Sequence, residues 1–142
     1  MPYAMQAWLG PGLAGVARRL PAGATERLLS ENPLLPVMLG QRPEVLDAFS
    51  LRLAAARQPE IRAAVFDRLN GREYRAVVLV DWSGAPVEER WRAIERHASR
   101  GVPQFYGGMN FPPDFLEALR DNYRLSFVVP PFVIFEPRPL AP

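Results

Sequence analysis

The stretch Ala76-Val77-Val78-Leu79-Val80 decides the fold class of this sequence. Its five apolar residues are mostly β-branched and have a charged residue on either side, which is typical of a buried strand. Before it, residues 27–30 predict a brief apolar strand. After it, residues 125–129 and 132–136 predict two strands that meet at Pro130-Pro131, because proline suits a turn or an edge and not a central strand.

The segments between these strands carry helix signals. Asn32 followed by Pro33 is a good helix start, and Gly40 is a matching stop, because glycine enters the left-handed region at little cost. A last helix opens at Pro112-Pro113, with Phe115, Leu119 and Tyr123 on its inner face. The other expected helices cover residues 13–20, 47–57, 59–70 and 86–99.

Alternating strands and helices predict an α/β fold. We expect a small three-layer α/β sandwich with a mainly parallel sheet and an antiparallel C-terminal strand pair. The 142 residues have room for one core, so we expect a single domain over residues 1–142, in which residues 1–15 are a flexible or helical lead-in.

Composition excludes several classes of protein. There are no cysteines, so neither a disulfide framework nor a thiolate metal site can form, and no motif calls for a metal or another cofactor. The 17 basic residues are all arginine, but they are scattered and the net charge is only +2, so nucleic-acid binding is not expected. No stretch has the ~20 apolar residues of a membrane span, and residues 1–17 lack a positive leader and a cleavage site, so we expect a soluble chain.

Polar residues directly follow the first strand and form one candidate ligand site. Ser30, Glu31 and Asn32 would lie at the C-terminal edge of the sheet, where α/β proteins bind ligands and where helix N-termini favour anions. The alternative is structural: Asn32 caps its helix, and Glu31 is solvated.

The two residues that directly follow the central strand, Asp81 and Trp82, would lie on the same edge. Asp81 could bind a metal or a sugar hydroxyl, and Trp82 could stack on a sugar ring. The alternative is that they cap the next helix and close the core. His97 is the only histidine, and no nucleophile motif accompanies it, so we expect it to lie on the surface and no catalytic residue is assigned.

The order of several short motifs resembles a known domain. These motifs are Ser30-Glu31-Asn32-Pro33, Leu39-Gly40-Gln41-Arg42-Pro43, Asp47-Ala48-Phe49, Val77 to Leu79, Leu119 to Leu125, and Phe132 to Phe135. Together they resemble the soluble C-terminal extracytoplasmic domain of polytopic membrane glycosyltransferases of the protein mannosyltransferase and aminoarabinose transferase superfamily, which use lipid-linked sugar donors. Asn32 and Ala48 depart from the aspartate and the proline usual in that pattern.

The resemblance implies a non-catalytic domain with a structural, acceptor-contact or docking role. Its partner would be the transmembrane portion of a glycosyltransferase, with contact to a sugar or a lipid-linked sugar, at the extracytoplasmic face of the membrane. The catalytic acidic residue of that family lies among transmembrane helices, so the resemblance assigns none here.

Two other functions fit the same residues. One is a stand-alone α/β protein that binds a sugar phosphate or a nucleotide at the Ser30 and Asp81 edge. The other is an interaction module that adds partners through an exposed terminal strand, Phe132 to Glu136.

Overall fold

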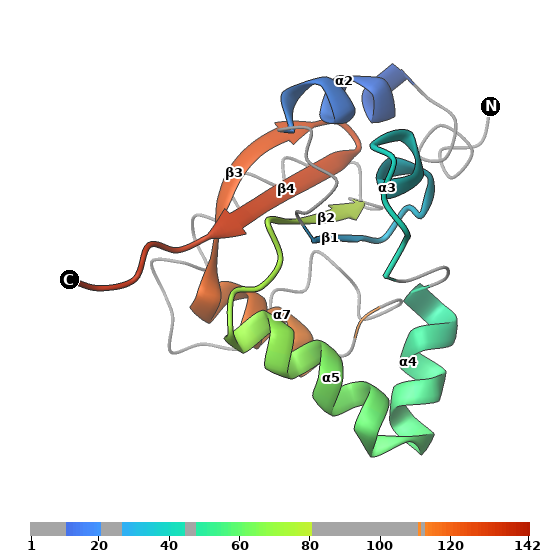
Figure 1. The fold of residues 1–142 in the computed structure, drawn as a ribbon, viewed down its shortest axis with the longest axis vertical. Coiled ribbons are helices and arrows are strands. Elements are labelled where there is room, and N and C mark those ends of the chain that lie inside the picture. Colours follow the sequence, from blue (N-terminus) through green and yellow to red (C-terminus); the bar gives the residue numbers. More distant parts are fainter. Residues whose placement is uncertain (1–10, 21–26, 45–47, 81–110, 112) are drawn as a thin grey trace.

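The computed structural model describes residues 11–20, 27–44, 48–80, 111 and 113–142 (Figure 1). Within them the chain is a mixed α/β fold with five helices and a four-stranded sheet, as the sequence predicts. The helix predicted over residues 86–99, together with Asp81, Trp82 and His97, lies outside the described residues. The elements are α2 (Pro11–Arg19), β1 (Leu28–Ser30), α3 (Leu34–Met38), α4 (Ala48–Arg57), α5 (Pro59–Asn70), β2 (Ala76–Val80), α7 (Pro113–Asn122), β3 (Tyr123–Val129) and β4 (Phe132–Pro137).

The described strands have the order β1-β2-β4-β3. β1 and β2 are parallel, with Leu29 opposite Val77, whereas β4 is antiparallel both to β2 and to β3. A mainly parallel sheet is therefore not confirmed, because only one of the three described pairings is parallel. The cause is the β3–β4 hairpin, which closes at Pro130-Pro131 through a cis peptide bond and inserts its second strand beside β2.

The position of β4 also corrects one prediction about partners. Phe132 to Glu136 cannot serve as an exposed edge strand, because β4 is hydrogen-bonded to a neighbour on each side and Phe132 to Phe135 are fully buried. Of the strands in the described sheet, β1 and β3 are the outer two. The sequence does not reveal this order, because the order of strands in a sheet depends on contacts between segments that are distant in the chain.

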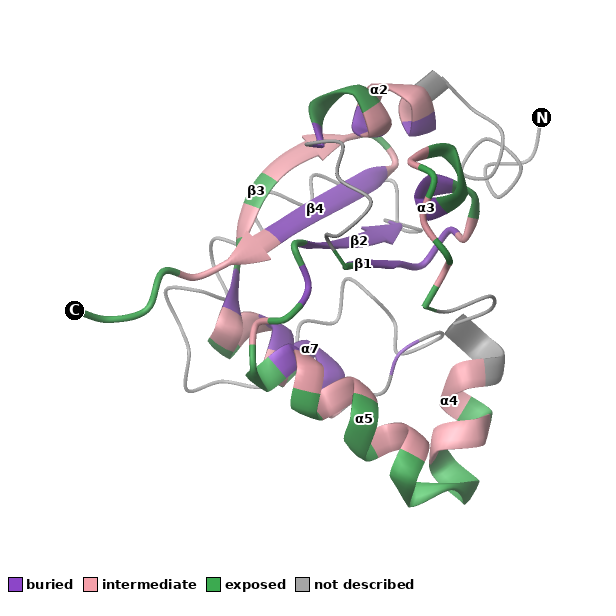
Figure 2. Cartoon of the chain, viewed as in Figure 1, coloured by how far each residue is buried: buried purple, intermediate pink, exposed green. Residues whose placement is uncertain are grey.

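Both faces of the sheet are buried, and alternate residues of each strand point to opposite faces. On one face, Val77, Leu79 and Val133 pack with residues of α5 and α7, including Leu69 and Leu119. The other face packs against α2 and α3, with contacts from Leu13, Val16, Leu20 and Leu35. Figure 2 shows the buried central strands between exposed outer helix surfaces.

The ends of α3 form as the sequence predicts. The side-chain oxygen of Asn32 accepts a hydrogen bond from the N–H of Leu34 at 2.9 Å. At the other end, Gly40 has φ +71°, its N–H donates to the carbonyl of Val37, and the N–H of Gln41 donates to the carbonyl of Pro36. This pattern is a Schellman motif, which satisfies carbonyls that the helix leaves open.

The last helix ends earlier than its apolar pattern predicts. Tyr123 was expected on the inner face of that helix but is the first residue of β3. Its ring is still fully buried in the core on the α5 and α7 side, so the burial predicted for it is confirmed although its element is not.

Candidate functional site

The candidate site begins at the carboxyl end of β1, beside the carboxyl end of β2. Ser30, Glu31 and Asn32 are 2%, 5% and 2% exposed, so all three polar residues lie inside the protein. Ser30 is the last residue of β1, so these three consecutive residues lie at its carboxyl end. Their burial means that each polar group needs a hydrogen-bond partner within the protein.

Ser30 and Asn32 form a local turn. The hydroxyl of Ser30 donates to the carbonyl of Asn32 at 2.8 Å and accepts from the N–H of the same residue at 3.2 Å. The Asn32 side chain then accepts from Leu34 at the start of α3. These bonds use the side chains to join a strand to a helix, which is the capping role that the sequence offered as the alternative to ligand binding.

Glu31 is not solvated, which corrects the structural alternative proposed for it. Its N–H donates to the carbonyl of Val78 at 2.9 Å, which extends the β1–β2 ladder by one step. Its carboxylate accepts a hydrogen bond from the N–H of Val80 at 2.7 Å. Glu31 therefore holds the last residue of β2 through a side-chain oxygen and the preceding ladder step through its backbone.

The hydrogen bond from Val80 to Glu31 brings the carboxyl ends of β1 and β2 together. Val80, which Glu31 binds, directly precedes Asp81 and Trp82, both outside the described residues. Among the described residues, no group of three or more histidine, cysteine, aspartate or glutamate side chains could hold a metal ion. The described part of the site can join strands and a helix, and it contains no arrangement of nucleophile and base.

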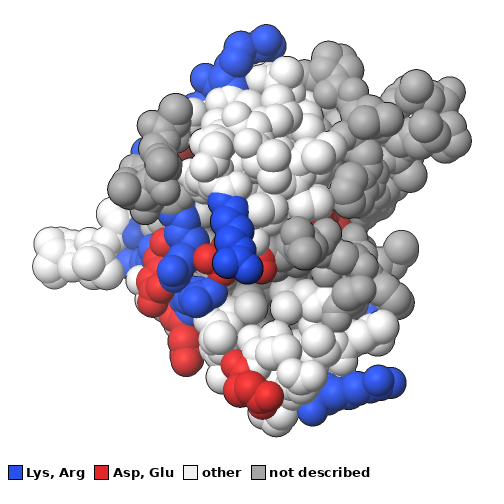
Figure 3. Space-filling model, turned by 45° about the vertical axis from the view of Figure 1, so that its right-hand side comes forward, with Lys and Arg blue, Asp and Glu red and all other residues white. Residues whose placement is uncertain are grey.

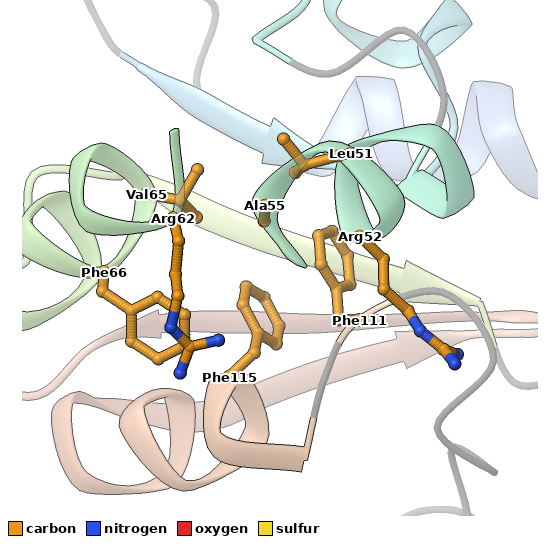
Figure 4. A pocket seen from close by; sticks show the side chains of 8 residues that line it. All are labelled: Leu51, Arg52, Ala55, Arg62, Val65, Phe66, Phe111 and Phe115. Atoms are coloured by element: carbon orange, nitrogen blue, oxygen red, sulfur yellow. The ribbon is translucent and has the colours of Figure 1, made fainter. Parts of the chain in front are cut away.

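A second feature is a half-open pocket between α4, α5 and α7 (Figure 4). The rings of Phe111 and Phe115 stack in its floor with centroids 4.0 Å apart. Arg62 lies over the ring of Phe66 at 4.6 Å and forms an ion pair with Asp114. Leu51, Arg52, Ala55 and Val65 complete the lining.

The pocket is small for a ligand site. Its volume is about 20 Å³, far below the ~300–1,000 Å³ of typical ligand pockets. The guanidinium of Arg62 is already held by a carboxylate and a ring. No motif in the sequence predicts this pocket. Its one sequence signal is the four-residue spacing of Phe111 and Phe115.

Charged side chains link the opposite end of the β1–β2 pair to neighbouring segments. Glu44 binds Arg27 at 3.0 Å and Arg68 at 2.6 Å, and Arg27 also binds Glu73 at 2.9 Å. All four side chains are partly exposed, so each pair contributes little, on the order of 0–1 kcal/mol. Figure 3 shows basic and acidic atoms interleaved on the middle and lower part of one face.

Two buried tyrosines lie near this charged network. The hydroxyl of Tyr123 accepts from the backbone N–H of Tyr74 at 3.2 Å and donates to its carbonyl at 3.4 Å. The hydroxyl of Tyr74 is buried and makes no hydrogen bond of good geometry within the described residues. Burial raises the pKa of Tyr74 to about 12 against the opposing effect of Arg68, and burial likewise raises the pKa of Tyr123 to about 12.

Comparison with known proteins adds no relative: no family model, no curated protein and no solved structure matches the chain. Across the described residues, none of the helices is both long and apolar enough to cross a membrane.

Proposed function

We propose that this chain is a non-catalytic domain of, or derived from, a membrane glycosyltransferase that uses lipid-linked sugar donors. Its role is structural, in acceptor contact or in docking, with the transmembrane portion of the enzyme as its partner at the extracytoplasmic face. One observation carries the proposal: at the sheet edge where a ligand would bind, Ser30, Glu31 and Asn32 are buried and bonded within the chain. Polar groups that are already hydrogen-bonded within the chain suit an accessory domain better than a reaction centre.

The arrangement of the elements gives further support. The motifs that resemble the tail domain of such enzymes include Ser30 to Pro33 and Val77 to Leu79, and these segments are adjacent in the described sheet. Helices pack against both faces of that sheet, which supports the finer proposal of a small three-layer sandwich.

Two measurements test this proposal. The reading frame upstream of the Met1 codon is expected to continue through several apolar spans of ~20 residues. The purified chain is expected to transfer no sugar from a lipid-linked donor to an acceptor. Sugar transfer by the chain alone would contradict a non-catalytic role.

A second candidate function is binding of a sugar phosphate or nucleotide at the same edge. The hydrogen bond from Val80 to Glu31 favours it, because it places the turn at Ser30 to Asn32 beside the residue that precedes Asp81. Calorimetric titration with a panel of sugar phosphates and nucleotides tests this function. Saturable binding that is lost in Asp81→Ala but kept in Asp121→Ala, an exposed control on α7, would establish it, and absence of binding across the panel would exclude it.

A further inference from the structure

The helices α2 and α3 cover the same face of the sheet, and the outer surface of this layer is unusual in its chemistry. α3 exposes three large apolar side chains, with Leu34 at 39%, Val37 at 56% and Met38 at 52%. Single exposed apolar residues are ordinary, but three on one five-residue helix form a contiguous patch. We call this layer's exposed side the α2–α3 surface: Leu34, Val37 and Met38 lie on α3 beside β1, and Arg18 and Arg19 lie at the end of α2 beside β3, at the opposite edge of the sheet.

Charge on this surface has one sign. α2 ends in Arg18 and Arg19, both exposed, and neither α2 nor α3 contains an acidic residue. Arg19 is held over the ring of Phe127 at 4.0 Å, so its charge has a fixed place beside the layer. Figure 3 shows one face of the molecule, with basic atoms at its top and a broad uncharged area below them.

Two of the helices on the other face differ in charge, whereas α4 contains no acidic residue and exposes one large apolar side chain, Leu53. α5 exposes Glu60 and Asp67, and α7 exposes Glu117 and Asp121, interspersed with arginines. The asymmetry matters because an anionic bilayer attracts basic groups and repels acidic ones, while its interface accepts aliphatic side chains. Of the two helical layers among the described residues, only the α2–α3 layer has three exposed large apolar side chains and no acidic residue in any of its helices.

We propose that the α2–α3 surface rests on an anionic lipid bilayer, with Val37 and Met38 in the interface and Arg18 and Arg19 against the phosphates. This inference rests on the proposed function, since a domain tethered to a membrane enzyme needs only weak affinity for the surface to stay in contact with it. Three aliphatic side chains and two arginines match such weak, salt-sensitive contact.

The absence of cysteine makes a site-specific test simple. Val37→Cys carries the polarity-sensitive dye NBD on α3, and Leu53→Cys carries it at a site of similar exposure, 49%, on α4 over the other face. Vesicles of phosphatidylcholine with one third phosphatidylglycerol are expected to shift the Val37 emission to the blue and to leave the Leu53 emission unchanged. Added salt is expected to reverse the shift.

A charge-reversal variant distinguishes binding through this surface from non-specific attraction of a basic protein to anionic lipid. Arg18→Glu is expected to weaken the partition of the Val37-labelled chain by at least roughly fivefold, the effect of about one basic group at an anionic surface. Arg57→Glu, at the exposed end of α4, is the matched control and is expected to change the partition of the labelled chain much less.

Several outcomes would overturn the inference. They are no blue shift at Val37 with the anionic vesicles, an equal shift at Leu53, or an equal shift with pure phosphatidylcholine. A blue shift that grows with protein concentration without lipid would assign the surface to a second copy of the chain instead. The proposed function fails separately, on sugar transfer or ligand binding by the isolated chain.

Discussion

Gly12 lies where α2 touches the turn of the β3–β4 hairpin. A Cβ atom at this position would stand 2.7 Å from the carbonyl oxygen of Pro130 and 3.5 Å from the ring of Phe132. The first contact is with backbone, which cannot rotate away. Glycine is therefore used here to let a helix and a turn approach closely, although it lowers the helix propensity of α2.

Gly12→Ala is expected to destabilise the chain by about 1–3 kcal/mol through overpacking, despite a gain in helix propensity of about 1 kcal/mol. Gly15→Ala is the matched control, because its Cβ would meet only the Val129 side chain at 3.2 Å. Urea unfolding of both variants measures the difference. A Gly12→Ala variant as stable as the wild type would show that the helix can move away from the turn.

The buried tyrosines allow a comparison of two hydroxyl groups. Tyr123→Phe removes the partner of the Tyr74 backbone N–H and is expected to cost about 1–3 kcal/mol. Tyr74→Phe removes a buried hydroxyl with no well-formed hydrogen bond in the described residues, so its cost is expected to stay below about 1 kcal/mol. Equal losses in urea unfolding would contradict this assignment of the hydrogen bond.

The same tyrosines predict a pH dependence. Their pKa is raised to about 12 in the folded chain, whereas tyrosine in the unfolded chain ionises near about 10. The unfolded state therefore loses protons first as the pH rises. Stability is expected to be fully present below about pH 10 and to fall up to about pH 12, less steeply in either phenylalanine variant. Urea unfolding at a series of alkaline pH values checks the slope.

At the scale of elements, Glu31 joins the ends of two strands. Its backbone extends the ladder to Val78, and its carboxylate holds the N–H of Val80. One residue therefore positions the exit of β2, from which the chain continues into Asp81 and Trp82. The ligand site at this edge stays a prediction, and within the described residues Ser30, Glu31 and Asn32 are hydrogen-bonded to the chain itself.

Glu31→Ala leaves the buried N–H of Val80 without its carboxylate and is expected to cost about 1–3 kcal/mol. Glu31→Gln keeps an oxygen acceptor on a side chain of the same length, so its loss of stability is expected to be less than half that of Glu31→Ala. Thermal or urea unfolding compares the two, with Glu117→Ala, at an exposed position of α7, as the control. If glutamine cost as much as alanine, the negative charge and not the acceptor would be what the edge requires.

Elements were more predictable than their arrangement. Asn32, Gly40 and Pro59 mark helix ends by local chemistry, so the helices they bound appear close to where the sequence places them. The sheet order was not predictable, because the pairing of Val78 with Ile134 joins segments far apart in the chain. The buried state of Glu31 escaped prediction for the same reason, since its partner Val80 lies 49 positions away.

At the scale of the whole molecule, β4 connects both layers of helices. Ile134 points to the α2 and α3 side, while Val133 and Phe135 point to the α5 and α7 side. Both faces share this strand, so we expect them to unfold together.

Ile134→Ala is expected to cost about 2–5 kcal/mol, as for other fully buried large apolar residues. The near-ultraviolet signal of the tyrosines on the opposite face is expected to shift to the same lower denaturant midpoint as the far-ultraviolet helix signal. Leu140→Ala, at a residue 82% exposed, is the control with no expected change. Separate midpoints for the two signals would show that the layers unfold independently.

The place of β4 also bears on how the chain is made. Residues 132–137 leave the ribosome after every other described element, yet they supply the strand between β2 and β3. The β1–β2 pair must therefore wait with one side open while the rest of the chain is translated, at about 5–20 residues per second. A nascent chain halted before Phe132 is expected to remain sensitive to protease, and the sheet closes only when its final strand arrives.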